Sequence, residues 1–327
     1  MPVGWRRELF QTGHTPCENP RSDFIIFTSG NTVYESPDMI LITGAAGKTG
    51  LAVLKSVLPA GEDVRVLIRQ DFQAAELREL GAAETVVGDM SDPDLLRRAF
   101  EGMRAVYHIC PNMHPEEVKI GQYAIAAARS AGLEYFVYHS VLHPQVREMA
   151  HHWNKLQVEA LLLKSGLNYT ILQPASYMQN ISGYWSKMLT DGEYAVPYAV
   201  DARFSMVDLD DVAQVAALVI REGGRHFGAI YELCGPQQLS SADIAQMSGD
   251  AIHRMVHAVA LDRAAWDRSA RDHGMKDYAR MTLLSMFEYY DQYGFVGNAM
   301  VLGQLLGRTP TRFEEYLHRT TYLTTSD

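Results

Sequence analysis

The chain has 327 residues, 47% of them hydrophobic, which suits one large or two small domains with a packed core. Its formal net charge of −10 argues against binding to a nucleic-acid backbone, because such binding needs a basic face. There is no disulfide or zinc-site spacing among the three cysteines, no signal-peptide pattern and no apolar run near the roughly 20 residues of a membrane span, so we expect a cytoplasmic protein that contacts no membrane.

The first 38 residues differ from the rest of the chain. Residues 1–38 carry Pro, Ser, Thr and Asn without periodic apolar positions, and only residues 24–27 could form a short added strand. Met39 stands directly before the first regular strand pattern. We therefore expect a poorly ordered N-terminal extension over 1–38, and we hypothesise that Met39 is the native start.

From Met39 onwards, strand patterns alternate with helix patterns. This alternation predicts an α/β fold with a doubly wound parallel sheet of the Rossmann type, and we assign its domain to residues 39–174. The predicted strands cover residues 39–43, 64–69, 84–87, 105–109, 135–140 and 169–172, and the predicted helices cover 51–58, 73–80, 93–100, 116–131 and 150–165.

After Pro174 the pattern becomes less regular and richer in Met, Tyr and Trp. We predict a smaller, mostly helical substrate lobe over 175–327, interleaved with the Rossmann core and lying over the carboxyl ends of the strands. Tyr177, Met178, Tyr184 and Trp185 could line a pocket for a flat, apolar substrate or could simply be core residues. Strands are expected at 204–207 and 231–234, and helices at 208–220, from residue 240 or 241, and at 262–293.

The strand at 39–43 leads into a turn with three glycines that opens a helix. Gly-Lys-Thr at 47–49 suggests a triphosphate-binding loop, but the first glycine of that motif would fall at Ile42. The spacing G-x-x-G-x-x-G instead favours a dinucleotide turn, in which free amides at the helix N-terminus hold a pyrophosphate. A glycine turn without a ligand is the structural alternative. The candidate cofactor contacts are Gly44, Ala46, Gly47, Lys48, Thr49 and Gly50.

Arg69 ends the second predicted strand, where an acid holds the ribose 2′-hydroxyl in NAD-binding folds. An arginine suits a 2′-phosphate, and Lys48 adds a second cation within reach. We therefore favour NADP(H) over NAD(H) as the cofactor, with a solvated strand-end arginine as the alternative.

The ends of the third and fourth predicted strands supply further candidates. Asp89, followed by Met90, could accept a hydrogen bond from the adenine amino group or could cap the next helix. Cys110 and Pro111 follow the fourth strand, where contacts to the cofactor ribose are expected. We interpret Cys110 as a small packing residue, because no cation stands where it would lower the thiol pKa.

Several of these segments together resemble one family. Over Met39 to about Leu317 the chain is similar to the NmrA-like family of atypical short-chain dehydrogenases. The resemblance implies a Rossmann-type fold, NAD(P)H-dependent reduction of quinones, azo dyes or triphenylmethane dyes, or dinucleotide binding by a regulator without reduction. The matching segments are residues 43–50, Arg69, Gly88-Asp89, residues 151–155 with Glu159, residues 165–174 with Asn180, and residues 234–236.

The superfamily's catalytic pair is Tyr-x-x-x-Lys on one helix. Here Lys155 is present, but His151 occupies the tyrosine position. The resemblance implies that Lys155 holds the nicotinamide ribose and that Pro174 lies beside the cofactor. His151 could be the proton donor or an ordinary first-turn histidine. Ser140, at the end of the fifth strand, could orient the substrate.

We predict an NADPH-dependent reductase that transfers hydride to a quinone-like or other conjugated small molecule, since such acceptors need less help from a dedicated acid. The alternative is a non-catalytic redox sensor that binds NADP(H) and acts through a protein partner. An epimerase is a weaker option, because the tyrosine is absent. Histidines gather at strand ends, but their spacing does not match a metal site, so we expect no metal.

Overall fold

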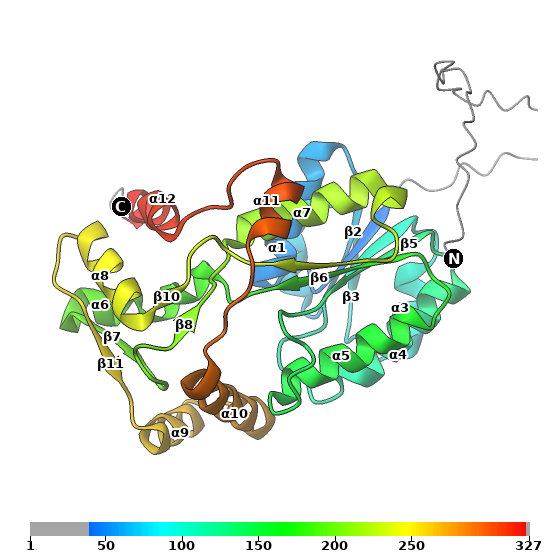
Figure 1. Cartoon of the computed structure of the whole chain (residues 1–327). Coiled ribbons are helices and arrows are strands. Elements are labelled where there is room, and N and C mark those ends of the chain that lie inside the picture. Colours follow the sequence, from blue (N-terminus) through cyan, green and yellow to red (C-terminus); the bar gives the residue numbers. More distant parts are fainter. Residues whose placement is uncertain (1–38, 325–327) are drawn as a thin grey trace, which may run out of the picture. The chain divides into compact units, whose positions relative to one another are not determined.

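The computed structural model describes residues 39–324, so the predictions for 1–38 and for a strand at 24–27 lie outside the described residues. Within this range, seven parallel strands form one sheet in the order β3-β2-β1-β4-β5-β6-β9 (Figure 1). The predicted doubly wound α/β class is confirmed. The strands are β1 (Ile40–Thr43), β2 (Val64–Ile68), β3 (Glu84–Val87), β4 (Ala105–His108), β5 (Tyr135–His139), β6 (Tyr169–Pro174) and β9 (Ala229–Leu233).

Helices cover both faces of this sheet (Figure 1). On one face α1 (Lys48–Val57) packs against α7 (Leu209–Glu222), and the opposite face carries α3 (Pro93–Phe100), α4 (Glu117–Ser130) and α5 (Ala150–Leu163). The strand order changes direction between β1 and β4, so the crevice for a ligand is expected beside these two strands. The shorter helical elements of this half are α2 (Ala74–Glu79) and the 3₁₀ turns Leu58–Ala60 and Asp71–Gln73.

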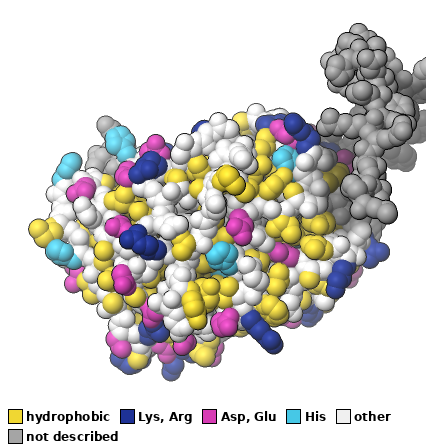
Figure 2. Space-filling model, viewed as in Figure 1, with side chains coloured by type: hydrophobic (Ala, Val, Ile, Leu, Met, Phe, Trp, Pro, Cys, Tyr) yellow, Lys and Arg dark blue, Asp and Glu magenta, His cyan; other side chains and the backbone are white. Residues whose placement is uncertain are grey.

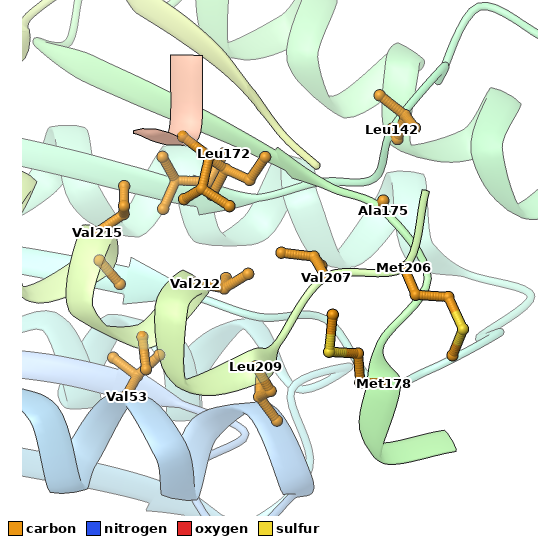
Figure 3. Packing of buried hydrophobic residues seen from close by; sticks show 14 of the residues in the cluster. Val53, Leu142, Leu172, Ala175, Met178, Met206, Val207, Leu209, Val212 and Val215 are labelled. Carbon is orange, nitrogen blue, oxygen red and sulfur yellow. The ribbon is translucent and has the colours of Figure 1, made fainter. Parts of the chain in front are cut away.

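The sheet separates two hydrophobic cores. Neighbouring side chains on a strand point to opposite faces, so Ile40 packs into the core beneath α1 and Leu41 into the core beneath α3 and α4. Figure 3 shows part of the first core, in which Val53 of α1, Val212 of α7 and Leu172 of β6 all take part. Because both faces are covered, the strands are apolar on both sides, which explains the continuous apolar runs in the sequence.

The chain beyond β6 forms the smaller lobe and also returns to the sheet. β9 and α7 come from this half, so the two halves are interleaved, while the domain boundary at residue 174 stays a prediction. The remaining elements are α6 (Trp185–Asp191), β7 (Glu193–Val196), β8 (Arg203–Phe204), β10 (Leu239–Ser240), α8 (Ser241–Ala251), β11 (His257–Ala260), α9 (Arg263–Asp272), α10 (Asp277–Tyr293), α11 (Met300–Leu306), α12 (Phe313–Thr324) and the 3₁₀ turns Met178–Tyr184 and Gly223–His226.

The lobe differs from the sequence prediction in three ways. The strand expected at 204–207 is only Arg203–Phe204, which pairs with β10. The parallel pair of β7 and β11 was not predicted, because the strands are short and far apart in sequence. The helix expected over 262–293 is divided near Gly274, whose φ of +78° ends α9.

The surface of the described residues has two further features. On the face shown in Figure 2, Lys and Arg side chains are scattered among Asp and Glu side chains and do not gather into one basic patch. Between residues 39 and 324, no helix combines the length and the apolar character needed to cross a membrane.

Candidate functional site

A cavity of about 700 Å³ lies at the carboxyl ends of the central strands, where doubly wound sheets bind ligands. It extends from the turn after β1 to the first turns of α5 and to side chains of the lobe. All residues selected from the sequence as cofactor contacts or catalytic groups line it, although their individual roles stay predictions. These residues are Gly44, Ala46, Gly47, Lys48, Thr49, Gly50, Arg69, Asp89, Met90, Cys110, Pro111, Ser140, His151, Lys155 and Pro174.

The turn between β1 and α1 leaves backbone amides free. Gly44 has a φ of +62°, which L side chains rarely adopt, and a Cβ at Gly50 would lie 2.6 Å from the Cα of Ala45. No side chain caps α1, and its first paired amide is that of Leu51. The amides of residues 48–50 therefore have no partner within the described chain, which is the arrangement that binds a phosphate at a helix N-terminus.

Gly50→Ala is expected to lower the free energy of unfolding by about 2 kcal/mol, because the new methyl group overlaps the backbone of the preceding turn. Gly47→Ala is the matched control. Its Cβ would meet only the Gly44 carbonyl oxygen, at 3.3 Å, and its φ of −80° suits alanine. Urea denaturation of both variants checks the difference, and equal losses would contradict the close approach described for Gly50.

Two side chains at the ends of β2 and β3 face the same end of the cavity. Arg69 is exposed, and its guanidinium has no hydrogen-bond or ion-pair partner among residues 39–320. Asp89 accepts a hydrogen bond from the Ser91 amide (2.8 Å), which lowers the pKa of this carboxyl group. The cap of α3 is Asp92, so Asp89 does not serve as the cap of that helix.

The start of α1 contacts the segment that follows β6. The Lys48 ammonium group lies 3.3 Å from the side-chain oxygen of Asn180, and Thr49 donates a hydrogen bond to the Tyr177 hydroxyl (3.4 Å). The glycine turn and the segment after β6 thus form neighbouring walls of the cavity.

A buried carboxylate that sequence analysis missed lies behind the α5 side chains. Glu117 is fully buried at the start of α4, and its Oε1 accepts a hydrogen bond from the Lys155 ammonium group at 2.6 Å. Its Oε2 lies 3.4 Å from Nδ1 of His151. Burial raises the pKa of Glu117, but Lys155 and His151 outweigh that effect and lower it to about 2. Glu117 is therefore an anion that binds the Lys155 ammonium group and lies beside His151.

The sequence gives little sign of this role. Two adjacent glutamates at the start of a helix, Glu116 and Glu117, are the pattern of a solvent-exposed first turn. Glu117 and Lys155 are also 38 positions apart in the sequence. Only the packing of α4 on α5 brings them together. Gly121 permits this packing, since a Cβ there would lie 2.7 Å from the side-chain methyl groups of Val158.

His151 presents its two ring nitrogens to different surroundings. Nδ1 is buried near Glu117, whereas Nε2 is not buried and makes no hydrogen bond to the described residues. Since His151 lines the cavity, Nε2 is the atom available to a ligand. The Glu117 carboxylate lies behind the ring, although Oε2 and Nδ1 do not form a hydrogen bond in the described structure.

The Ser140 hydroxyl is engaged by the protein. It donates a hydrogen bond to Glu159, which also accepts from the Gln173 amide group at 2.9 Å. Burial raises the pKa of Glu159. Cys110 is also buried, which raises its thiol pKa well above the usual value, so the thiol is neutral.

Aromatic rings of the lobe also line the cavity. Tyr177 and Tyr184 line it as the sequence suggested, whereas Met178 is buried in the core and Trp185 is not a lining residue. Adjacent rings pack closely, with centroids 5.0 Å apart for Phe204 and Tyr290. Most of this aromatic wall comes from segments not singled out in the sequence, namely Tyr194, Tyr198, Phe204, Met206, Leu283, Met286, Phe287, Tyr290 and Phe295.

Comparison with known proteins places this fold in a family. The model of the NmrA-like family matches residues 36–317. The chain belongs to the NmrA-like family. Its cavity lies at the carboxyl ends of the strands, where doubly wound sheets bind ligands, and the glycine turn, Arg69 and Lys155 line it.

Relatives of this NmrA-like protein have different recorded roles. It is 27% identical over 283 residues to the NAD(P)H azoreductase of Xenophilus azovorans, covering 85% of this chain and 96% of the relative. It is 28% identical over 218 residues to the photosystem II assembly factor Ycf39 of Cyanophora paradoxa, covering 64% and 67%. The NADPH-dependent quinone oxidoreductase QOR2 of Escherichia coli, solved with NADPH, superposes with a TM-score of 0.77 at 24% identity, covering 86% and 100%.

Proposed function

We propose that this protein binds NADP(H) and transfers hydride to a quinone-like or other conjugated electrophilic small molecule. The observation that carries the proposal is the composition of one cavity. The glycine turn, Arg69, Lys155, His151 and aromatic rings of the lobe all line it. The azoreductase and quinone reductase relatives support the same class of reaction.

The residues of the cavity fit such a cofactor. The free amides at residues 48–50 suit a pyrophosphate, and the unpaired guanidinium of Arg69 suits a 2′-phosphate. Lys155 has three N–H donors, of which Glu117 and the His139 carbonyl oxygen (3.3 Å) engage two, so one is left for a ribose hydroxyl. Asp89 would contact the adenine, as the sequence suggested.

Bound NADPH supplies a hydride, and in the overall reaction it is oxidised to NADP⁺ while a quinone gains that hydride and one proton from water. The chain contributes orientation and charge. Lys155, held by Glu117, fixes the ribose, and His151 offers Nε2 as a proton donor. The aromatic wall excludes water and stacks on a flat acceptor.

Steady-state oxidation of NADPH against a panel of quinones, azo dyes and triphenylmethane dyes tests the proposal. We expect turnover with at least one conjugated acceptor and a His151→Gln variant that is slower by about 10²-fold. Tight binding of NADPH without turnover of any acceptor would contradict the reductase proposal.

Arg69→Ala is expected to raise the dissociation constant for NADPH by about 10- to 100-fold, because a charge-assisted contact to the 2′-phosphate is lost. The dissociation constant for NADH should change little. Isothermal titration with both cofactors measures the effect, with Arg78→Ala as the control, since Arg78 is exposed on α2 and does not line the cavity. A parallel loss for NADH would contradict the assignment.

A second candidate is a sensor that binds NADP(H) and acts through a protein partner. The missing tyrosine on α5 and the similarity to an assembly factor favour it. A sensor needs the glycine turn and Arg69 but not the exposed Nε2 of His151. Unchanged biological activity of a His151→Gln variant, together with no NADPH oxidation, would favour the sensor.

A further inference from the structure

Three side chains, Tyr107, His139 and Tyr177, form a hydrogen-bonded series that reaches the cavity. The Tyr107 hydroxyl on β4 lies 2.7 Å from Nδ1 of His139 on β5, and Nε2 of that histidine lies 2.7 Å from the Tyr177 hydroxyl. Tyr177 follows β6, and the neighbouring amide of Met178 donates to the carbonyl oxygen of Val207 (2.9 Å). The series therefore joins three parts of the fold with little freedom to rearrange.

The surroundings of Tyr107 decide how the protons are arranged. This residue is fully buried, and within residues 39–320 its hydroxyl has no partner except Nδ1 of His139. An unsatisfied buried donor costs about 1–3 kcal/mol, so the Tyr107 hydroxyl donates its proton to Nδ1. Burial lowers the pKa of His139 to about 3, so the ring is neutral and has a single N–H. That proton must then be on Nε2.

This tautomer determines what Tyr177 can do. Nε2–H of His139 donates to the Tyr177 hydroxyl oxygen, and Thr49 donates to the same oxygen from 3.4 Å. The oxygen thus accepts two hydrogen bonds, and its own proton is left without an acceptor in the described protein. Tyr177, His139 and Thr49 all line the cavity, so a bound ligand can provide that acceptor.

Tyr177 offers a phenol to the cavity that Lys155 also lines, and α5 lacks the tyrosine of the Tyr-x-x-x-Lys pair. Lys155 donates to the carbonyl oxygen of His139 (3.3 Å), while the ring of the same histidine holds Tyr177. His139 therefore connects the retained lysine with a phenol from another element. In the superfamily pattern the phenol comes from the position of His151 on the same helix as the lysine.

We propose that Tyr177 is a catalytic residue that donates a hydrogen bond to the acceptor oxygen, and that His139 and Tyr107 are positioning residues that leave its proton free. The inference rests on the proposed reductase function. When a quinone gains a hydride, an electron pair moves onto its oxygen, which then takes the proton that His151 Nε2 offers, and water replaces that proton on the histidine. Tyr177 stabilises the charge on this oxygen and keeps its own proton.

The tautomer of His139 tests the arrangement without any turnover. Nitrogen-15 NMR of the ring nitrogens, assigned by loss of the signals in His139→Gln, should show a neutral ring protonated on Nε2. Protonation on Nδ1 would mean that Tyr177 donates to the histidine instead, and this result would overturn the inference.

Acceptor chemistry tests the catalytic role. A quinone develops charge on oxygen, whereas a cationic triphenylmethane dye takes hydride on carbon and loses its charge. Tyr177→Phe should therefore lower kcat for the quinone by about 10²-fold and leave kcat for the dye unchanged within about twofold. The retained dye activity also shows that the variant is folded.

The control is Tyr135→Phe. Tyr135 is also buried on β5 with one hydroxyl partner, Thr170 at 2.5 Å, but it does not line the cavity. Tyr135→Phe should leave the ratio of kcat for the quinone to kcat for the dye unchanged. Full quinone activity in Tyr177→Phe, or equal losses for both acceptors, would overturn the inference alone. A wild-type protein that reduces no quinone, azo dye or triphenylmethane dye would overturn the proposed function and this inference with it.

Discussion

Lys155→Met should lower the free energy of unfolding at neutral pH by about 3 kcal/mol. The physical reason is the carboxylate that the substitution leaves behind. Glu117 is fully buried and ionised, and its 2.6 Å partner is the Lys155 ammonium group. After the substitution only His151, at 3.4 Å from Nδ1 to Oε2, remains within ion-pair distance in the described structure. The same variant should also lose the predicted contact to the cofactor ribose.

A double-mutant cycle separates the charge effect from lost packing. Combining Lys155→Met with Glu117→Gln removes both charges and should recover much of the stability, so the two losses should not add. Lys164→Met is the control, because Lys164 is exposed at the end of the same helix. Urea denaturation of the four proteins gives the coupling energy. Strictly additive losses would contradict a direct ion pair between Glu117 and Lys155.

Acidification from about pH 7 to pH 5 should destabilise the protein by on the order of 5 kcal/mol. Burial lowers the pKa of His108 to about 4 and the pKa of His139 and His152 to about 3 each, from an ordinary value of 6.5. These depressed values mean that the neutral rings stabilise the fold above pH 6.5. As the pH falls below 6.5, the unfolded chain binds up to three more protons than the folded protein. The free energy of unfolding therefore decreases until the pH reaches the pKa values of the folded state, about 3 to 4.

The free energy of unfolding, measured by urea denaturation across this range, checks the prediction. His152→Gln should reduce the slope by about a third, since one of three groups is removed. His257→Gln is the control, because His257 is exposed on β11. The ionised Glu117 adds a separate loss at lower pH, between its ordinary value of 4.5 and its folded value of about 2. A stability that is flat between pH 7 and pH 5 would contradict the neutral buried histidines.

The fold, and the part of the cavity lined by the glycine turn, Arg69 and Asp89, were predictable because their sequence signals are local. Strand, glycine turn and helix follow one another within about 20 residues, and parallel strands place their carboxyl ends at one edge. Residues chosen only because they follow strand ends, such as Arg69, Asp89 and Cys110, therefore line the same cavity.

The part of the cavity around Lys155, Tyr177 and the aromatic rings depends on contacts between segments that are distant in sequence. Glu117 of α4 meets Lys155 of α5, and Tyr177, in the segment after β6, meets His139 at the end of β5. The aromatic wall combines residues near 194–206 with residues near 283–295. Sequence periodicity does not report such pairings, because burial in a core and exposure to a cavity give similar patterns of apolar residues.

The central claim is that the bound nicotinamide transfers its hydride, and a single-turnover experiment tests it most directly. The protein, in excess over NADPH, is mixed rapidly with a quinone while the absorbance of the reduced nicotinamide is followed. We predict that this absorbance disappears in one phase, that one hydroquinone forms per NADPH, and that the phase slows in Tyr177→Phe. NADPH that stays bound and reduced in the presence of every quinone and dye tested would contradict the account.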